Sequence, residues 1–148
     1  MYFVDREKIE QTLTYMQECL NVFADQQSWH TTIEKLAVER IAHVVIESII
    51  DTGNSMIDGF IMRDPGSYED IVDILEDEKV VTTEMAVSLK KVIAYRKQLV
   101  QDYTDINHNE LADALTTEGT HLNAFPTAVR DYLTNELGPV SAFLPNEK

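Results

Sequence analysis

The stretch AYRKQLVQDYTDIN, residues 94–107, contains the side chains whose types and spacing could do chemistry. Arg96 falls among apolar residues at helical spacing, and Tyr103 follows seven residues later. A continuous helix would therefore place both on one face, about 10.5 Å apart along its axis. A guanidinium on an apolar stripe must be paired or must line a cleft, because burying an unpaired charge costs several kcal/mol. This pattern predicts either an inter-helix ion pair, with Tyr103 as a packed aromatic, or a functional cleft.

The counter-ion for Arg96 must come from another part of the chain. Asp51 and Glu47 lie on a long predicted helix, at a depth that matches Arg96 if the two helices pack side by side. Either carboxylate could pair with the guanidinium, and we expect Asp51 to support the site.

Helical periodicity of apolar residues dominates the chain, and no strand pattern competes with it. The sequence predicts an all-α, single-domain bundle of about five helices. Its last helix should be kinked near Pro126, because apolar residues stay in phase on both sides of the proline. Ser28 is the expected N-cap of the second helix, and Gly53 is where we expect that helix to bend or break. The predicted helices cover residues 4–25, 28–61, a short segment after Ser67, 82–103 and 108–137.

The bundle is expected to occupy residues 1–137. A Gly-Pro pair ends the last helix, so that residues 138–148 form a tail that either frays or docks through Phe143 and Leu144. With 44% apolar residues and little Gly or Pro, a chain of this length should bury an ordinary core.

The charge balance bears on possible partners. Twelve Lys and Arg against 26 Asp and Glu give a net charge of −14, which opposes binding to phosphate backbones and anionic membranes. Cys19 has no partner for a disulfide, the N-terminus has no secretory leader pattern, and no apolar run approaches the ~18 residues of a membrane span. We therefore expect a cytoplasmic protein without a membrane segment, for which RNA is possible but disfavoured.

Metal and cofactor sites are not expected. The histidines have no partner at the spacings that zinc sites use, and the carboxylates of the second helix lack the paired Glu-x-x-His motifs of di-metal bundles. Phosphate-binding glycine loops and serine-nucleophile elbows are also missing. His43 falls on the apolar side of its helix, which favours a hydrogen-bonded core histidine. The four histidines are His30, His43, His108 and His121, and the carboxylates are those of Glu47, Asp51 and Asp58.

Residues 30–108 resemble the HepT-like family of the HEPN superfamily. The resemblance rests on the helix that contains Asp51, on the turn formed by Pro65, Ser67 and Tyr68, and on the AYRKQLVQDYTDIN stretch. Members of this family are helical, dimeric, metal-independent ribonuclease toxins, in which two copies of a motif meet across the dimer interface. A nucleotidyltransferase antitoxin can silence such a toxin by adenylylating the motif tyrosine. The resemblance thus implies a homodimer and a possible nucleotidyltransferase partner.

The family's motif is an arginine, four to six residues, a histidine, one residue and a tyrosine. Under this resemblance Arg96 matches the arginine, and Tyr103 matches the tyrosine and is the possible adenylylation site. Gln101 stands where the histidine belongs, and Asp102 and Tyr103 fill the positions that longer spacings would use. Metal-free RNA cleavage needs a group with a pKa near ~6.5 to move protons, and the glutamine amide has none. Losing such a group costs ~10²- to 10⁴-fold in rate.

Two functions remain open. In the first, the protein is an attenuated ribonuclease toxin, with Arg96 as transition-state clamp, Gln101 as polar positioner, and Asp51 and Asp102 in support. In the second, a non-catalytic helical dimer binds a nucleotidyltransferase partner or a nucleotide at the same cleft. His108 lies beyond the motif and could replace the missing histidine only through an unusual turn.

Overall fold

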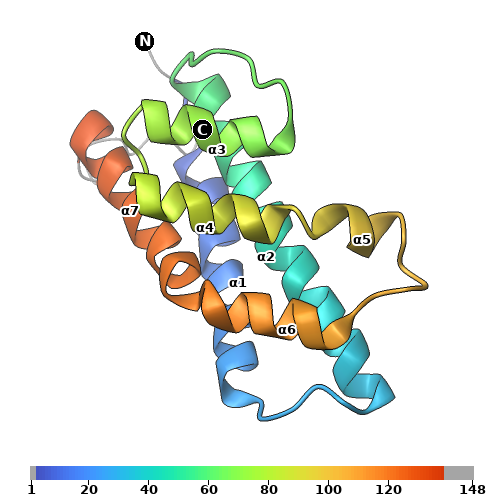
Figure 1. The fold of residues 1–148 in the computed structure, drawn as a ribbon. Coiled ribbons are helices and arrows are strands. Elements are labelled where there is room, and N and C mark those ends of the chain that lie inside the picture. The colour runs from blue at the N-terminus through green and yellow to red at the C-terminus, as the bar shows by residue number, and fades with distance from the viewer. Residues whose placement is uncertain (1–2, 139–148) are drawn as a thin grey trace.

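The structure is a computed structural model that describes residues 3–138 (Figure 1). The described part contains seven α-helices and no strand, so the predicted all-α class is confirmed and the predicted number of helices is too low. None of the described helices is long and apolar enough to cross a membrane. The predicted tail, with Phe143 and Leu144, lies outside the described residues from 139 onward. The helices are α1 (Arg6–Asp25), α2 (Thr32–Gly59), α3 (Tyr68–Asp77), α4 (Thr83–Ile93), α5 (Arg96–Val100), α6 (His108–Thr117) and α7 (Gly119–Leu137).

α2 is the central helix of the bundle. It runs antiparallel to α1, with α4 and α6 crossing in front of it in Figure 1, and it contacts every helix from α3 to α6. Most of its apolar residues from Val38 onward are buried, and the core is completed by α1, α3, α4, α6 and α7. Because α2 is packed on several sides, a polar side chain that it presents toward α5 is attached to a rigid backbone. Fully buried side chains of this core include Leu13, Met16, Ile46, Ile49, Leu89, Leu111 and Phe125.

The start of α2 is fixed by a capping box, and the prediction of Ser28 as N-cap is wrong. The Thr31 hydroxyl accepts the backbone N–H of Glu34 at 3.1 Å, and the Glu34 carboxylate accepts the N–H of Thr31 at 3.0 Å. The same carboxylate accepts the N–H of His30 at 3.0 Å. The Thr-x-x-Glu spacing is the recognised signature of this cap, so the signal was present in the sequence.

The predicted break at Gly53 is also wrong, because α2 is continuous through this residue. Gly53 instead allows α3 to pack closely on α2. A Cβ atom at this position would lie 2.3 Å from Cγ2 of Ile71. The glycine is thus needed for close helix packing, and backbone flexibility is not its role.

The predicted helix 82–103 consists of two helices, because the chain turns between α4 and α5. The N–H of Tyr95 bonds the carbonyl of Val92, three residues back, at 3.0 Å. The Tyr95 hydroxyl donates to Glu110 of α6, whereas the next residue, Arg96, reaches α2. These two contacts hold the turn against both α6 and α2.

The predicted helix 108–137 is interrupted at Glu118, and α7 continues through Pro126. The Ser88 hydroxyl of α4 donates to the Glu118 carboxylate at 2.6 Å and lies 2.6 Å from Nδ1 of His121. These contacts tie the junction of α6 and α7 to α4. Gly119 follows the junction directly, and a glycine within a helical pattern is a recognised sign of interruption.

Candidate functional site

Arg96 is the first residue of α5, and its side chain crosses to α2. Its Nε donates to Oε2 of Glu47 at 2.7 Å, and the two side chains are 25% and 31% exposed. The carboxylate thus fixes the guanidinium near the surface. The two terminal guanidinium nitrogens make no hydrogen bond to the residues that the structure describes, so they remain available to an anion. Of the two candidate counter-ions, Glu47 makes the ion pair and Asp51 does not.

Tyr68 covers the other side of the guanidinium. The Arg96 Cζ lies 4.4 Å from the centroid of the Tyr68 ring, within range of a cation–π interaction. Tyr68 begins α3, and the hydroxyl of Ser67 caps this helix by accepting the N–H of Asp70 at 3.0 Å, as the sequence predicts. The preceding loop therefore determines where the ring stands.

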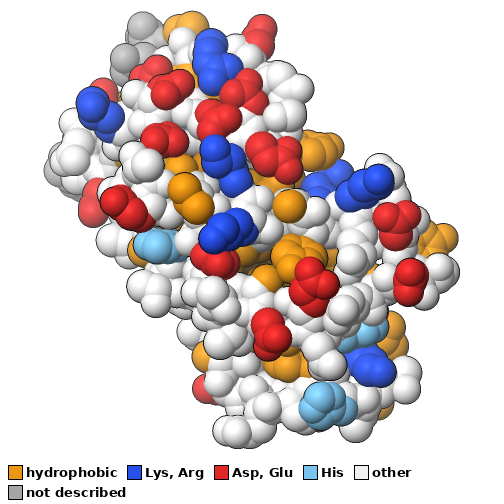
Figure 2. All heavy atoms as spheres, in the orientation of Figure 1, with side chains coloured by type: hydrophobic (Ala, Val, Ile, Leu, Met, Phe, Trp, Pro, Cys, Tyr) orange, Lys and Arg blue, Asp and Glu red, His pale blue; other side chains and the backbone are white. Residues whose placement is uncertain are grey.

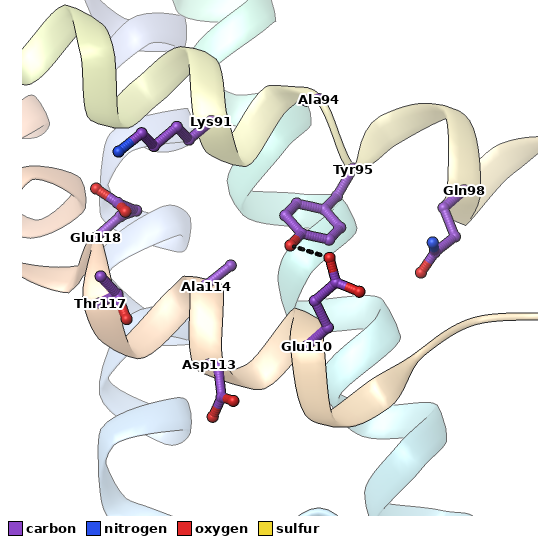
Figure 3. Close-up of a pocket in the computed structure, with 9 residues that line it drawn as sticks. All are labelled: Lys91, Ala94, Tyr95, Gln98, Glu110, Asp113, Ala114, Thr117 and Glu118. Carbon is purple, nitrogen blue, oxygen red and sulfur yellow. Dashed lines mark hydrogen bonds between the residues drawn. The ribbon is translucent and has the colours of Figure 1, made fainter.

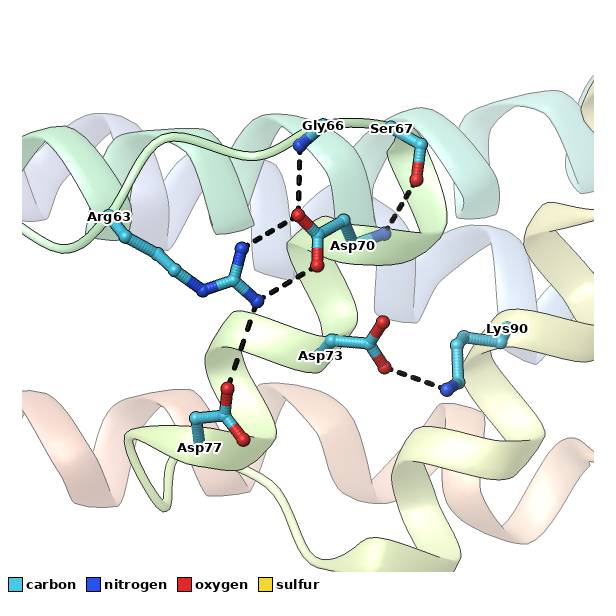
Figure 4. A network of polar contacts seen from close by, with 7 residues as sticks. All are labelled: Arg63, Gly66, Ser67, Asp70, Asp73, Asp77 and Lys90. Carbon is cyan, nitrogen blue, oxygen red and sulfur yellow. Dashed lines mark hydrogen bonds and ion pairs between the residues drawn. The ribbon is translucent and has the colours of Figure 1, made fainter.

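A polar network holds that loop (Figure 4). Arg63 donates two hydrogen bonds to the Asp70 carboxylate, at 2.7 and 2.9 Å, and Asp70 also accepts the N–H of Gly66 at 2.8 Å. These bonds lower the pKa of Asp70 to about 2, with the Arg63 hydrogen bonds as the largest cause. The network joins the end of α2 to the start of α3, and so it places Tyr68 against Arg96.

The carboxylates around Arg96 keep its guanidinium cationic. The hydrogen bond from Arg96 to Glu47 raises the pKa of Arg96 above its already high ordinary value. Asp51, one turn further along α2, has its pKa raised by partial desolvation and by repulsion from the Glu47 carboxylate. Asp51 is thus an exposed carboxylate beside the site, and it acts on Arg96 only by electrostatic attraction, without a hydrogen bond.

His43 is not the core histidine that we expected. Its side chain is 35% exposed, and its Nε2 lies 3.9 Å from Oε2 of Glu47, the oxygen that accepts the hydrogen bond of Arg96. Residues four apart on a helix share a face, which explains why His43 and Glu47 meet. The structure therefore brings an imidazole, a carboxylate and a guanidinium together.

His108 reaches α2 one turn before His43. Its Nε2 lies 2.6 Å from Oε2 of Glu39, and its side chain is 18% exposed. Glu39 and Glu47 are eight residues apart, or about 12 Å along the helix axis. His108 is thus separated from Arg96 by roughly this distance along α2.

The remaining motif positions lie beyond α5. Gln101 is the C-cap of this short helix, and Gln101 and Asp102 are exposed. Tyr103 is 65% exposed in the turn that follows. The predicted stacking of Arg96 and Tyr103 on one helical face is wrong, because no continuous helix joins them.

A groove of about 620 Å³ lies between the α4–α5 turn and α6 (Figure 3). Three carboxylates line it, from Glu110, Asp113 and Glu118, against the single ammonium of Lys91. Such a surface repels phosphate. The face drawn in Figure 2 likewise shows Lys and Arg side chains separated by acidic ones. A phosphate is therefore better accommodated at Arg96, which does not line this groove.

Tyr68 and His43, which lie around Arg96, were not identified as site residues from the sequence. Tyr68 belonged to a recognised turn, but its position on Arg96 depends on how the α2–α3 loop folds back. His43 gave a readable signal, because it stands four residues before Glu47, which was already a candidate counter-ion. Within residues 3–138 no three His, Cys, Asp or Glu side chains are close enough together to hold a metal ion.

Comparison with known proteins identifies close relatives. The chain is 57% identical over 143 residues to the Bacillus subtilis (strain 168) protein named "Putative RNase YutE", covering 97% of this chain and 99% of that protein. The solved structure of YutE from Bacillus subtilis, described as a cytosolic protein of unknown function, matches with a TM-score of 0.94 over 97% of this chain and 100% of that chain.

Two solved structures with lower identity share the fold. One is a toxin–antitoxin structure with AMP-PNP, at 16% identity and a TM-score of 0.74 over 83% of this chain and 97% of that chain. The other is a tri-AMPylated HEPN toxin of Shewanella oneidensis in complex with MNT antitoxin, at 18% identity and a TM-score of 0.73 over 83% of this chain and 96% of that chain. At these identities the likeness concerns the fold alone. The family model described as ribonuclease HepT-like matches residues 4–129, and the chain therefore belongs to the HepT-like ribonuclease family.

Proposed function

We propose that the protein is an attenuated, metal-independent ribonuclease toxin whose site is centred on Arg96. The observation that carries this proposal is the fixed guanidinium, held by Glu47 on one side and by the Tyr68 ring on the other. A pre-positioned donor of this kind stabilises the charge that develops on phosphorus oxygens during cleavage. Attenuation follows from Gln101, which stands at the motif position of the proton-transferring histidine and cannot move a proton near neutrality.

The proposed assembly is a homodimer whose two Arg96 clusters form one composite cleft, as the family resemblance implies. The proposed partner is a nucleotidyltransferase antitoxin that adenylylates Tyr103. Two observations support Tyr103 as the acceptor: its hydroxyl-bearing side chain is 65% exposed, and it follows α5 in a turn that a second protein could approach. The Shewanella toxin named above is itself AMPylated and bound to its antitoxin.

A second candidate function is a non-catalytic dimer that binds the nucleotidyltransferase or a nucleotide at the same cleft. The observation that favours it is the ion pair itself, because Glu47 already neutralises part of the Arg96 charge. The net charge of −14 acts in the same direction, since it weakens attraction for RNA.

Cleavage of single-stranded RNA by the purified wild type and by Gln101→His distinguishes the two functions. Under the ribonuclease proposal the wild type cleaves slowly, and Gln101→His cleaves faster by up to ~10²-fold, as a positioned acid or base would allow. A wild type and a Gln101→His variant that both leave RNA intact would favour the non-catalytic dimer.

Co-expression with a nucleotidyltransferase tests the role of Tyr103. Mass spectrometry should find one added AMP on Tyr103 in the wild type and none in Tyr103→Phe. Tyr95, whose hydroxyl is bonded to Glu110, is the internal control and should stay unmodified. AMP attached elsewhere, or nowhere, would remove Tyr103 from the proposal.

A further inference from the structure

One face of α2 carries an uninterrupted row of titratable side chains. Glu39, His43, Glu47 and Asp51 follow one another at intervals of four residues, which places them on one face of the helix. Glu39 is paired with His108, and Glu47 is paired with Arg96. The neighbours of this row along the helix are largely buried apolar residues.

The imidazole of His43 is free of hydrogen bonds to other side chains of the described residues, whereas that of His108 is not. The His108 imidazole is bonded through Nε2 to Glu39 at 2.6 Å. His43 has a looser contact, 3.9 Å from Nε2 to Glu47, and no hydrogen bond to another side chain of the described residues. Its ring is one-third exposed beside Arg96, with which it shares the same carboxylate oxygen. A phosphodiester held by the guanidinium would thus meet this imidazole.

We propose that His43 is the proton-transfer residue of this site and supplies from α2 the chemistry that Gln101 cannot supply after α5. This inference rests on the proposed ribonuclease function. Histidine is the side chain whose ordinary titration range suits proton transfer near neutrality. The Glu47 carboxylate lies between the two groups: it accepts the hydrogen bond of Arg96 at 2.7 Å and lies 3.9 Å from the imidazole of His43.

The step conserves atoms and charge. The ring nitrogen of neutral His43 that bears no proton takes the proton of an RNA 2′-hydroxyl while that oxygen forms a bond to the adjacent phosphorus. The bond from phosphorus to the 5′-oxygen breaks, the 5′-oxygen leaves with a proton from water, and the imidazolium returns its proton to solvent. The products are a 2′,3′-cyclic phosphate and a 5′-hydroxyl, while Arg96 stabilises the charge on the phosphorane oxygens.

The test compares two histidines that contact the same row in the full chain. His43→Ala should lower the rate of RNA cleavage by ~10²-fold or more, whereas the matched control His108→Ala should leave it unchanged. Imidazole added to the buffer should restore part of the rate of His43→Ala and none of that of Arg96→Ala. Circular dichroism establishes that each variant is folded, and His43→Gln, which fills the space of the ring, should be slow and insensitive to imidazole.

The outcomes separate the role of His43 from the ribonuclease function. A His43→Ala variant that cleaves like the wild type overturns the role of His43 and leaves the ribonuclease function standing. A slow His43→Ala variant without imidazole rescue also overturns it, because that result indicates a structural role. A wild type that leaves RNA intact overturns both proposals together.

Discussion

Arg96 and Glu47, 49 positions apart in the sequence, are joined by a hydrogen-bonded ion pair of 2.7 Å that fastens the short helix α5 to the central helix α2. α5 has no fully buried residue and no side-chain N-cap, so it depends on tertiary contacts of this kind. The pair thus links the stability of α5 to the geometry of the proposed site.

Substitution Glu47→Gln should weaken this link. The amide retains a hydrogen-bond acceptor but loses the charge, and because both side chains are about one-quarter to one-third exposed, we expect the free energy of unfolding to fall by only about 0.5–1 kcal/mol. Urea unfolding of Glu47→Gln, Arg96→Gln and the double variant measures the coupling between the two residues. Additive effects would show that the ion pair contributes nothing. The same substitution should lower the pKa of Asp51, since repulsion by Glu47 helps to raise it.

Substitution Gly53→Ala should destabilise the protein by about 1–3 kcal/mol, because its Cβ would meet the Ile71 side chain at 2.3 Å. Urea unfolding gives the value. The control is Gly119→Ala, where the added Cβ would meet nothing within 4 Å beyond its own stretch of helix. This substitution should be neutral or stabilising by up to about 1 kcal/mol. Equal effects of the two substitutions would contradict the close packing of α3 on α2.

Apolar periodicity was enough to predict the helical class and the approximate positions of α1 and α2, and Glu47 was one of the two carboxylates expected to pair with Arg96. Ser67 could be predicted as an N-cap because the pattern that marks it, a serine with an aspartate three residues later, is local in the sequence. The turn before Arg96 could not be predicted, because no Gly or Pro marks it and the contacts of Tyr95 and Arg96 that hold it come from two distant helices. The exposure of His43 likewise depends on how α5 and α3 lie over α2.

The Arg63–Asp70 pair makes a pH-dependent contribution to stability. The pKa of Asp70 is about 2 in the folded protein against an ordinary value of 3.8, so its ionised form stabilises the folded state above pH 3.8. This contribution is lost as the pH falls from 3.8 to about 2. An NMR titration of the Asp70 carboxyl should show a pKa near 2 in the wild type and a higher one in Arg63→Gln.

The matched control for that titration is Asp77→Asn, which removes a longer and more exposed contact of Arg63, at 3.7 Å. The pKa of Asp70 should stay near 2 in this variant. An unchanged pKa of Asp70 in Arg63→Gln would contradict the pairing of Arg63 with Asp70 that Figure 4 shows.

The most direct test of the central claim is the rate at which the protein cleaves single-stranded RNA in the presence of a metal chelator, with and without Arg96. Arg130 gives a matched control, because it too is an arginine in an inter-helix ion pair, with Glu10, at 2.9 and 2.6 Å. We predict that Arg96→Ala lowers the rate by ~10²- to 10³-fold, as the removal of a transition-state donor does, and that Arg130→Ala leaves it unchanged. Cleavage by Arg96→Ala at the wild-type rate would contradict the assignment of this site.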